Sequence, residues 1–543
     1  MSDTAVRQKL EPATTRWLCL FLVVLAAIVQ LSRIVQVESS TGEVPFHSAN
    51  DRSRWCTIAA LAVTGSYEID EVLEIRDPKS RRRTWYSIDL VRHRGADGKQ
   101  HYYSSKPPLL PTLYTGVYLG IRALTGSTLM NDPFFVVRTL LVVVNLLPLL
   151  AFWWLLVQCI QREPLSAWAA IVSSLFVAWG TYLSTFVSTL NNHLPAAIAV
   201  GLSLWCVQQI ALQRDRRWRW FLLAGLSTSF GAANELPALS WLAAVGALLL
   251  VVDARRTLLG YVPALLPVAL AFFGTNYLAH GEFNPAYAHR SVGEKLFSFE
   301  TESGLPLEQL PLDLVIEQMR QHGIEASSQA VLRPARRAGV YEFWDAEREH
   351  RVALRRDKEP AGGRVNVYAW GDWYDYPGSY WTSDRKQGVD KGEPNVLRYI
   401  FHSLIGHHGI FSLTPFWLLS LLGGVVVWRQ RTTLNVLVEH RLLLTAAIAA
   451  TSLVAIGFYL GRPLEDRNYG GVSSGFRWAF WLTPLWIWLA LQGLQVVQAR
   501  WARRLVEVLL GISVFSACFP WDNPWTSPWL MQYGQYLGWL AAG

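Results

Sequence analysis

Charged residues are scarce in this sequence. Asp, Glu, Lys and Arg make up 17% of its 543 residues, whereas hydrophobic residues make up 51%. Because a soluble domain is about 25% charged, the shortage excludes an ordinary soluble domain and predicts a membrane protein with polar insertions. The net charge of +8 would also suit a nucleic-acid partner, but arginine gathered in cytoplasmic loops gives a polytopic membrane protein the same balance. We therefore expect a lipid bilayer, and no nucleic acid, as partner.

Cysteine is scarce as well, and its spacing argues against two kinds of site. The five cysteines are Cys19, Cys56, Cys159, Cys206 and Cys518. They have neither the density of a disulfide framework nor the spacing of zinc ligands. We predict no metal site and no cofactor, and leave a divalent cation open. Internal repeats and low-complexity tracts are not evident either.

Long apolar runs are abundant. The first, Trp17 to Val37, has the ~20 residues that a helix needs to cross a bilayer. No small-x-small cleavage site follows it, so we interpret it as a retained signal anchor with a cytoplasmic N-terminus. Ten further spans are predicted at 134–158, 165–186, 192–212, 219–233, 236–252, 257–279, 410–428, 441–460, 478–498 and 505–519. The sequence thus predicts an all-α polytopic membrane protein with about 11 transmembrane helices.

Residues 107–125 are hydrophobic but are predicted not to cross the membrane. They begin with Pro107, Pro108 and Pro111 and contain Arg122. Their apolar positions recur at helical spacing on one face: Leu110, Tyr114, Val117, Tyr118, Ile121 and Leu124. A single apolar stripe is typical of a helix that lies flat in the membrane interface.

The distribution of arginine supports this topology. With 107–125 lying flat, the short cytoplasmic loops hold Arg162, Arg214, Arg216, Arg217, Arg219, Arg255, Arg256, Arg429, Arg431, Arg441, Arg500, Arg503 and Arg504. The short outer loops hold only Arg462, Arg467 and Arg477. A membrane-crossing helix at 107–125 would invert this pattern, against the preference for positive charge on the cytoplasmic side.

Two polar segments interrupt the apolar runs and divide the chain. A membrane module spans 1–279 with a first outer loop at 38–133, an extracytoplasmic insertion spans 280–409, and C-terminal membrane helices with a short outer tail span 410–543. In the first loop we predict a short helix from Ser48 or Asn50 and a β-hairpin within 86–103. In the insertion, the charged stretch from Ala335 to Glu359 predicts a solvated helix. The aromatic run that ends it, 368–381, suits either stacking on sugar rings or a belt at the membrane interface.

Three short motifs resemble those of the GT-C glycosyltransferases. They are Asn50-Asp51-Arg52-Ser53-Arg54-Trp55, Ser105-Lys106-Pro107-Pro108-Leu109-Leu110, and the stretch from Gly470 to Trp478. They are similar to an acidic motif and a Lys-Pro-Pro-Leu in that family's first outer loop, and to a Gly-Pro-Arg-Tyr before a late span. Asn50 replaces one acid of the first motif, and Phe476 replaces the proline of the third. The resemblance implies a membrane enzyme that takes a sugar from a polyprenyl-phosphate carrier, as aminoarabinose transferases and protein O-mannosyltransferases do.

Such a reaction needs a base for the acceptor hydroxyl and cations for the departing phosphate. We predict Asp51 as the base, although an acid at the start of a helix, paired with Arg54, would also be favoured by the helix dipole. Lys106 and Arg477 are the predicted phosphate ligands, with snorkelling to the interface as the alternative. Arg467 is a weaker candidate for phosphate, because neighbouring acids could neutralise it.

Five further polar residues are predicted to line the pocket. They are Asn192, His193, Glu235, His407 and His408. Asn192 could instead cap a helix that has proline in its first turn. Glu235 lies between two short spans, where an ionisable side chain is costly and indicates function. His407 and His408 point about 100° apart on a helix and make a poor metal site.

The function predicted is transfer of a sugar from a polyprenyl-phosphate-linked donor to an envelope glycan or lipid acceptor. The location expected is the outer face of the inner (cytoplasmic) membrane. Two alternatives remain. One is a flippase or transporter of lipid-linked sugars, which would favour internal repeats and paired broken helices at mid-membrane, neither of which is evident. The other is a non-catalytic subunit of an envelope assembly complex, in which Asp51 could be lost harmlessly.

Overall fold

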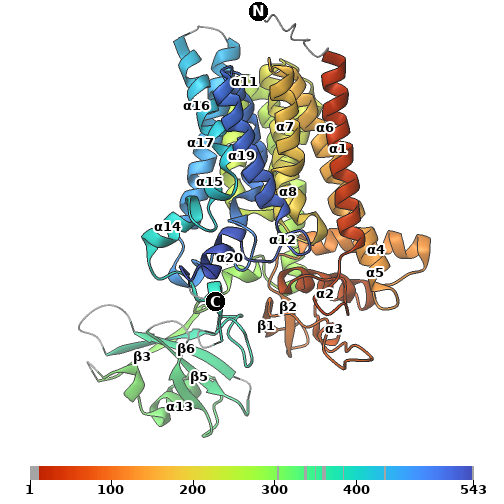
Figure 1. Cartoon of the computed structure of the whole chain (residues 1–543). Helices are drawn as coiled ribbons and strands as arrows, with labels where there is room; N and C mark the ends of the chain where they lie inside the picture. Colours follow the sequence, from red (N-terminus) through yellow and green to blue (C-terminus); the bar gives the residue numbers. More distant parts are fainter. Residues whose placement is uncertain are drawn as a thin grey trace, which may run out of the picture.

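The computed structural model describes residues 12–302, 305–335, 339–348, 350–356, 363–382, 385–432 and 436–540. An upright helical bundle carries a sheet-containing region at one end (Figure 1). Helices occur at all eleven predicted spans. The bundle consists of α1 (Pro12–Val35), α5 (Pro133–Leu141) continued by α6 (Leu147–Arg162), α7 (Ala167–Trp179), α8 (Tyr182–Thr185), α9 (His193–Val207), α10 (Trp218–Asn234), α11 (Leu239–Arg256), α12 (Val262–His280), α16 (Leu418–Arg429), α17 (Val436–Leu460), α18 (Thr483–Leu494) and α19 (Arg500–Cys518).

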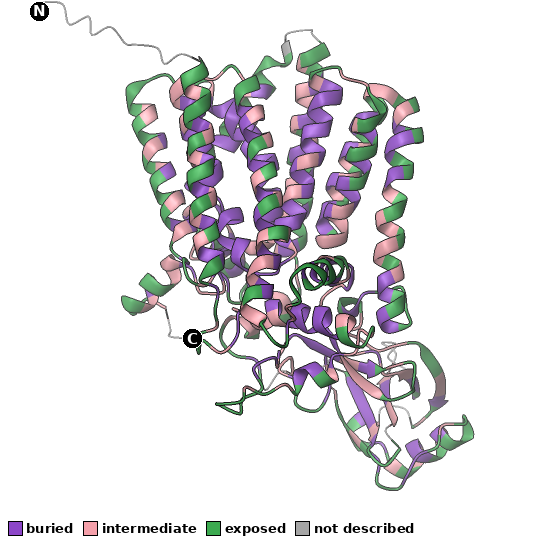
Figure 2. Cartoon of the chain, turned by 90° about the vertical axis from the view of Figure 1, so that its right-hand side faces the viewer, coloured by how far each residue is buried: buried purple, intermediate pink, exposed green. Residues whose placement is uncertain are grey.

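Within the described ranges, six helical segments are long and apolar enough to cross a membrane. They are Ala13–Val35, Pro133–Arg162, Ala167–Ser188, His193–Leu212, Leu236–Tyr261 and Val436–Leu460. Large apolar side chains on their outer surfaces are exposed, as with Trp17, Phe21 and Ile28 of α1, and exposed residues follow the outside of the bundle in Figure 2. The chain is therefore a multi-pass membrane protein, and the total of about 11 spans stays a prediction.

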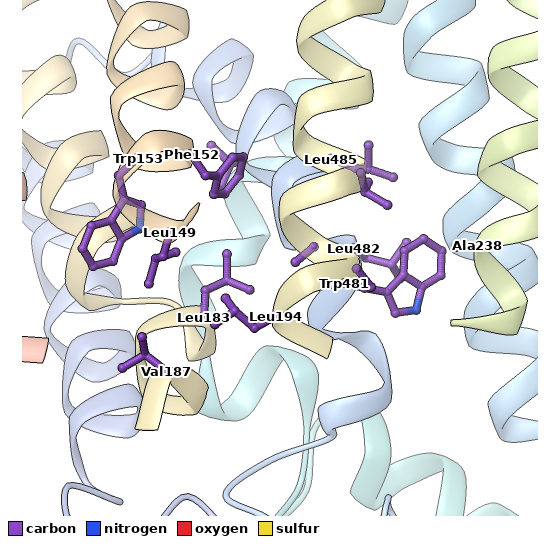
Figure 3. Close-up of a cluster of buried hydrophobic side chains, with 14 of the residues drawn as sticks. Leu149, Phe152, Trp153, Leu183, Val187, Leu194, Ala238, Trp481, Leu482 and Leu485 are labelled. Carbon is purple, nitrogen blue, oxygen red and sulfur yellow. The ribbon is translucent and has the colours of Figure 1, made fainter. Parts of the chain in front are cut away.

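The bundle core is packed through large rings and close helix crossings. In Figure 3, Leu183 and Leu194 lie between Trp153 of α6 on one side and Trp481 on the other. Between α16 and α18, a Cβ added to Gly423 would lie 1.8 Å from the backbone oxygen of Leu489. Small residues allow such close approach, which is the usual way that membrane helices pack together.

The first loop confirms two local predictions. It contains α2 (Ala49–Val63), α3 (Asp70–Leu73), a hairpin of β1 (Leu90–Arg94) and β2 (Gln100–Ser104), and α4 (Leu109–Thr125). The hairpin lies within the predicted residues 86–103 except for its last residue. Helix α4 lies across the end of the bundle (Figure 1), with Tyr114, Tyr118 and Ile121 buried and Leu124 90% exposed. Residues 107–125 thus do not form an upright helix of the bundle.

The insertion corrects the all-α prediction, because it holds a five-stranded antiparallel sheet in the order β3-β7-β6-β5-β4. The strands are β3 (Lys295–Glu300), β4 (Val331–Pro334), β5 (Val340–Asp345), β6 (His350–Arg356) and β7 (Arg364–Ala369), and α13 (Leu312–Gln321) packs on one face. The predicted helix from Ala335 to Glu359 is therefore wrong where it is described; residues 336–338, 349 and 357–359 lie outside the described residues. Alternate residues such as Phe343 and Leu354 enter the core between charged ones, which is the period of two of a strand. The fold is mostly helical with a small sheet.

Three further short helices complete the description, and the two ends of the bundle differ in what they carry. They are α14 (Val396–Leu404), α15 (Ile410–Leu413) and α20 (Trp529–Tyr536). Pro12 begins α1 at one end of the bundle, and α20 lies at the other end with α2, α4 and the sheet (Figure 1). We call the latter end the loop face. The side of the membrane that it faces, and the domain limits at 279 and 409, stay predictions.

Candidate functional site

A cleft of about 280 Å³ opens at the loop face, where the bundle meets the first loop and the insertion. We call it the inner cleft. It brings together residues from α2, the turn before α4, the start of α9, the end of α10 with the segment 235–237, the end of α17, and positions 462, 477 and 478. Of the residues predicted from sequence, Lys106, Asn192, His193, Glu235 and Arg477 line it.

Positive charge dominates the inner cleft. Five cations line it: Arg54, Lys106, Arg290, Arg462 and Arg477. Glu235 is the only carboxylate among the described residues of its lining. Asp89 stands behind Lys106, at 3.1 Å from its Nζ, and Asp466 pairs with Arg290 and Arg462. The lining therefore has an excess of positive charge.

Burial and mutual repulsion lower the pKa values of two of these cations. Burial, together with the nearby guanidinium groups of Arg54 and Arg477, lowers the pKa of Lys106 to about 8, although Asp89 opposes the shift. Burial also lowers the pKa of Arg54 to about 10. A bound anion would offset both the desolvation and the mutual repulsion, so this arrangement favours a phosphate-bearing ligand.

A chain of polar contacts leads from Glu235 into the cation cluster. Its carboxylate accepts hydrogen bonds from Asn192 Nδ2 at 2.7 Å and from the Tyr459 hydroxyl at 3.0 Å, and it contacts Nδ1 of His193. Nε2 of His193 lies 3.4 Å from the guanidinium of Arg477. If Nδ1 carries the proton toward Glu235, Nε2 is the acceptor for Arg477. The pair is thereby held at one wall of the cleft.

An apolar border joins the inner cleft to the lipid-facing surface. Leu236, Pro237, Phe458 and Trp478 line the cleft beside its polar groups. Leu236 and Phe458 are also exposed on the outside of the bundle. Because the outside of a membrane bundle faces hydrocarbon, an isoprenoid chain can lie along this border without entering water.

Asp51, the base predicted from the sequence, does not line the inner cleft. It is fully buried. Its carboxylate accepts hydrogen bonds from the backbone N–H groups of His47 (3.2 Å) and Leu190 (3.0 Å) and from Trp55 Nε1 (2.8 Å). These contacts fasten the start of α2 to the segment before α9, and the catalytic role of Asp51 stays a prediction.

The residue before it faces the cleft instead. Successive helical residues point about 100° apart, so on α2 Asn50 and Arg54 line the cleft while Asp51 is turned away. Arg54 donates to Asn192 Oδ1 at 2.7 Å and also binds Asn50. The sequence reasoning did not assign Arg54 a part in the site, although its spacing of four from Asn50 places the two on one helix face.

The remaining predicted residues lie apart from the inner cleft. Arg467 donates to the carbonyl oxygens of Arg462 and Pro394. His407 and His408 form a ring cluster with His402 and Tyr469, and burial lowers the pKa of His407 to about 3. None of the three predicted residues is among those lining the cleft.

Arg290, Arg462 and Tyr459 were missed as site residues. Arg462 is one of only three arginines in the short outer loops, whereas most arginines lie in the predicted cytoplasmic loops. This exception could have indicated that Arg462 belongs to the site. Arg290 belongs to the insertion, and nothing in its local sequence indicates that it reaches the cleft. No cluster of three or more His, Cys, Asp or Glu able to hold a metal occurs in the part of the chain that the structure describes.

No protein-family model and no curated protein sequence matches the chain. Among solved structures, it is similar to a chain of the S. cerevisiae protein O-mannosyltransferase Pmt1-Pmt2 complex bound to the sugar donor, with 10% identity and a TM-score of 0.46, over 97% of this chain and 92% of that chain. It is also similar to the archaeal oligosaccharyltransferase AglB from Archaeoglobus fulgidus, in complex with an inhibitory peptide and a dolichol-phosphate, with 11% identity and a TM-score of 0.40, over 96% of this chain and 57% of that chain. Both matches extend over nearly the full length of this chain, and no residue role is carried over from either.

Proposed function

We propose that the chain is a membrane glycosyltransferase that uses a polyprenyl-phosphate-linked sugar donor. The observation that carries the proposal is the inner cleft, in which five cations face one carboxylate beside a lipid-facing apolar border. A donor of this class has the same three parts: an anionic phosphate, a sugar and an isoprenoid chain. The acceptor is an envelope glycan or lipid on the outer face of the cytoplasmic membrane, as the arginine asymmetry predicts.

In the proposed reaction, the cations hold the phosphate while an acceptor hydroxyl attacks the anomeric carbon. The anomeric C–O bond to phosphate breaks, and the polyprenyl phosphate leaves with the bonding electrons. Arg54, Lys106 and Arg477 stabilise the charge that develops on the leaving phosphate, since charge-assisted hydrogen bonds are the strong ones. A single displacement of this kind inverts the anomeric configuration.

The hydroxyl proton needs an acceptor, and Glu235 is the carboxylate best placed for it. It lines the cleft and is oriented by Asn192 and Tyr459. Asp51 is the alternative base suggested by the first-loop motif, but it is fully buried and does not line the cleft. Glu235 is therefore the proposed general base, and the variants Glu235→Gln and Asp51→Asn distinguish it from Asp51.

The direct test is transfer by the purified full chain in lipid. A deletion strain is first analysed by mass spectrometry for lipid-linked sugars that accumulate, and the accumulated species is then offered to the protein as donor. The proposal expects release of polyprenyl phosphate and appearance of the sugar on a membrane or envelope acceptor. Movement of intact donor across the bilayer without release of its phosphate would instead indicate a flippase.

A further inference from the structure

A second cleft lies outside the site described above. It has a volume of about 570 Å³ and is bounded by the β1–β2 hairpin, the end of α12 and the insertion's sheet. Residues that form its walls include Arg92, His93, His280, Trp344, Arg351 and Trp370. We call it the outer cleft. Its volume falls within the ~300–1,000 Å³ typical of ligand pockets.

A column of stacked rings stiffens one wall of the outer cleft. His93 stacks between Tyr103, at 4.2 Å between ring centroids, and Trp373, at 4.0 Å. His289 stacks on the other side of Trp373 at 3.6 Å. Rings held in this way keep their orientation without a ligand. Both faces of His93 and of Trp373 are covered by neighbouring rings, so these two residues form a rigid wall of the cleft.

Two cations of the outer cleft, Arg333 and Arg351, form ion pairs with acids that line the same cleft. Arg351 binds Glu342 on the neighbouring strand and Asp375 of the aromatic run, and its guanidinium lies 3.7 Å from the centre of the Trp370 ring. Arg333 also binds Glu342, at 2.9 Å. The charges of an ion pair neutralise each other, but its atoms can still donate and accept hydrogen bonds. This wall therefore suits a ligand rich in hydroxyl groups.

Two histidines add a hydrogen-bond acceptor. Nδ1 of His93 lies 2.9 Å from the carbonyl oxygen of Arg94, which can only accept, so Nδ1 carries the proton. Burial lowers the pKa of His93 to about 4, and the ring is neutral. Its Nε2 therefore accepts from Nδ1 of His280 at 3.0 Å, which leaves Nε2 of His280 as an acceptor on a residue that lines the cleft.

We propose that the outer cleft is a binding site for a saccharide chain, with a ring face of the sugar against Trp344 and its hydroxyl groups against the paired ions and His280. The aromatic run provides both clefts with a wall, because Trp373 lines the outer cleft and the next residue, Tyr374, lines the inner one. If the chain is the proposed glycosyltransferase, the saccharide bound here is the acceptor of the transfer reaction; this assignment rests on the proposed function. A chain held in the outer cleft would present its end near the donor.

A peptide fits this geometry less well than a saccharide. Extended peptides are commonly bound at the exposed edge of a sheet, where backbone groups pair with them. The outer cleft instead uses a face of the sheet: Glu342 and Trp344 come from β5 and Arg351 from β6, which lie inside the strand order. On that face side chains, rather than backbone groups, meet the ligand.

The test is an array of neutral and acidic oligosaccharides probed with fluorescently labelled full chain in detergent. Wild type should bind a subset of the array, and Trp344→Ala should lower the affinity for that subset about tenfold or more. Trp344→Phe keeps a ring and should recover part of the binding. The matched control is Tyr368→Ala, because Tyr368 lies on the same sheet but does not line the outer cleft; it should bind as wild type does.

Binding of the lipid-linked donor is measured on the same samples and separates the two proposals. Trp344→Ala should bind donor normally, which also shows that it is folded. Two results would overturn the outer-cleft site. One is a wild-type chain that binds donor but no saccharide, and the other is a Trp344→Ala variant that binds saccharides as well as wild type does. Capture of peptides rather than saccharides overturns it as well. Saccharide binding that depends on Trp344, without donor binding, leaves this site standing and overturns the proposed function.

Discussion

The inner and outer clefts differ in how their charges are satisfied. In the inner cleft, Arg54, Lys106 and Arg477 are crowded together with few acids, and burial works against their charge. In the outer cleft, Arg351 is locked between Glu342 and Asp375. The acids that pair with inner-cleft cations, Asp89 and Asp466, lie outside the lining of that cleft, so its surface keeps an excess of positive charge that a bound anion would offset. The difference assigns an anionic ligand to the inner cleft and a largely uncharged one to the outer cleft.

The proposed roles require both clefts to lie on the same side of the membrane. Thiol labelling of introduced cysteines tests this requirement, and each site should either react or not react. Cysteines introduced at Ser127, beside α4, and at Gln309 of the insertion should react with an impermeant thiol reagent from outside. A cysteine at Gln213, in the arginine-rich loop between α9 and α10, should not. The wild-type chain gives the background from its own cysteines. Reaction at Gln213 but not at Ser127 would reverse the predicted orientation.

Replacing Glu235, the proposed base, should have the next largest effect. Glu235→Gln preserves the acceptor oxygen for Asn192 or Tyr459 but removes the proton acceptor, so the transfer rate should fall ~100-fold, the usual scale for a general base. Asp51→Asn should leave the rate per folded molecule near that of wild type. The measurement is single-turnover transfer at saturating donor. A large loss in Asp51→Asn with full activity in Glu235→Gln would restore Asp51 as the base.

Asp51→Asn should instead affect stability, because its amide cannot accept from all three donors. An unsatisfied buried group costs ~1–3 kcal/mol. Burial raises the pKa of Asp51 from 3.8 to about 6, so the folded state holds the proton to higher pH than the unfolded chain. The contribution of Asp51 to stability therefore falls as the pH rises from about 4 to about 6, and thermal unfolding of the Asn variant should lack that component.

The cations of the inner cleft should show a smaller but specific effect. Lys106→Gln and Arg477→Gln should each weaken donor binding about tenfold, and Arg477→Lys should be poorly tolerated if the contact is bidentate. Donor binding by wild type should also weaken above pH 8, as Lys106 loses its proton. Arg467→Gln is the matched control, since Arg467 binds carbonyl groups outside the cleft. An equal loss in all three Gln variants would indicate a general effect of surface charge.

The smallest effect is expected for Tyr459→Phe, which removes one hydrogen bond to Glu235. A neutral hydrogen bond contributes ~1 kcal/mol, so the rate should fall about fivefold while donor affinity is unchanged. Saturation kinetics with the lipid-linked donor distinguish the two quantities. A change in donor affinity alone would place Tyr459 in ligand binding rather than in the orientation of Glu235.

Properties that depend on local sequence were predicted well. The six long apolar helices follow from apolar runs of sufficient length, the position of α4 across the end of the bundle from its single apolar stripe, and the hairpin from alternation around a turn. The insertion shows the limit of this reasoning. In β5 and β6 frequent charges concealed the alternation of Phe343 and Leu354, and the charged face is explained only by the ion pairs of Arg351 and Glu342.

The residues themselves determined that the chain enters the membrane, because the cost of transferring each side chain into hydrocarbon is nearly additive along the sequence. They also placed Lys106, His193, Glu235 and Arg477 at the ends of spans on one face. Only the tertiary structure decided which polar residues meet. A rotation of about 100° between neighbours on α2 turns Asn50 toward the cleft and Asp51 away from it, and the folded insertion brings Arg290 to the same place. Contacts between residues distant in sequence depend on packing, which no local pattern records.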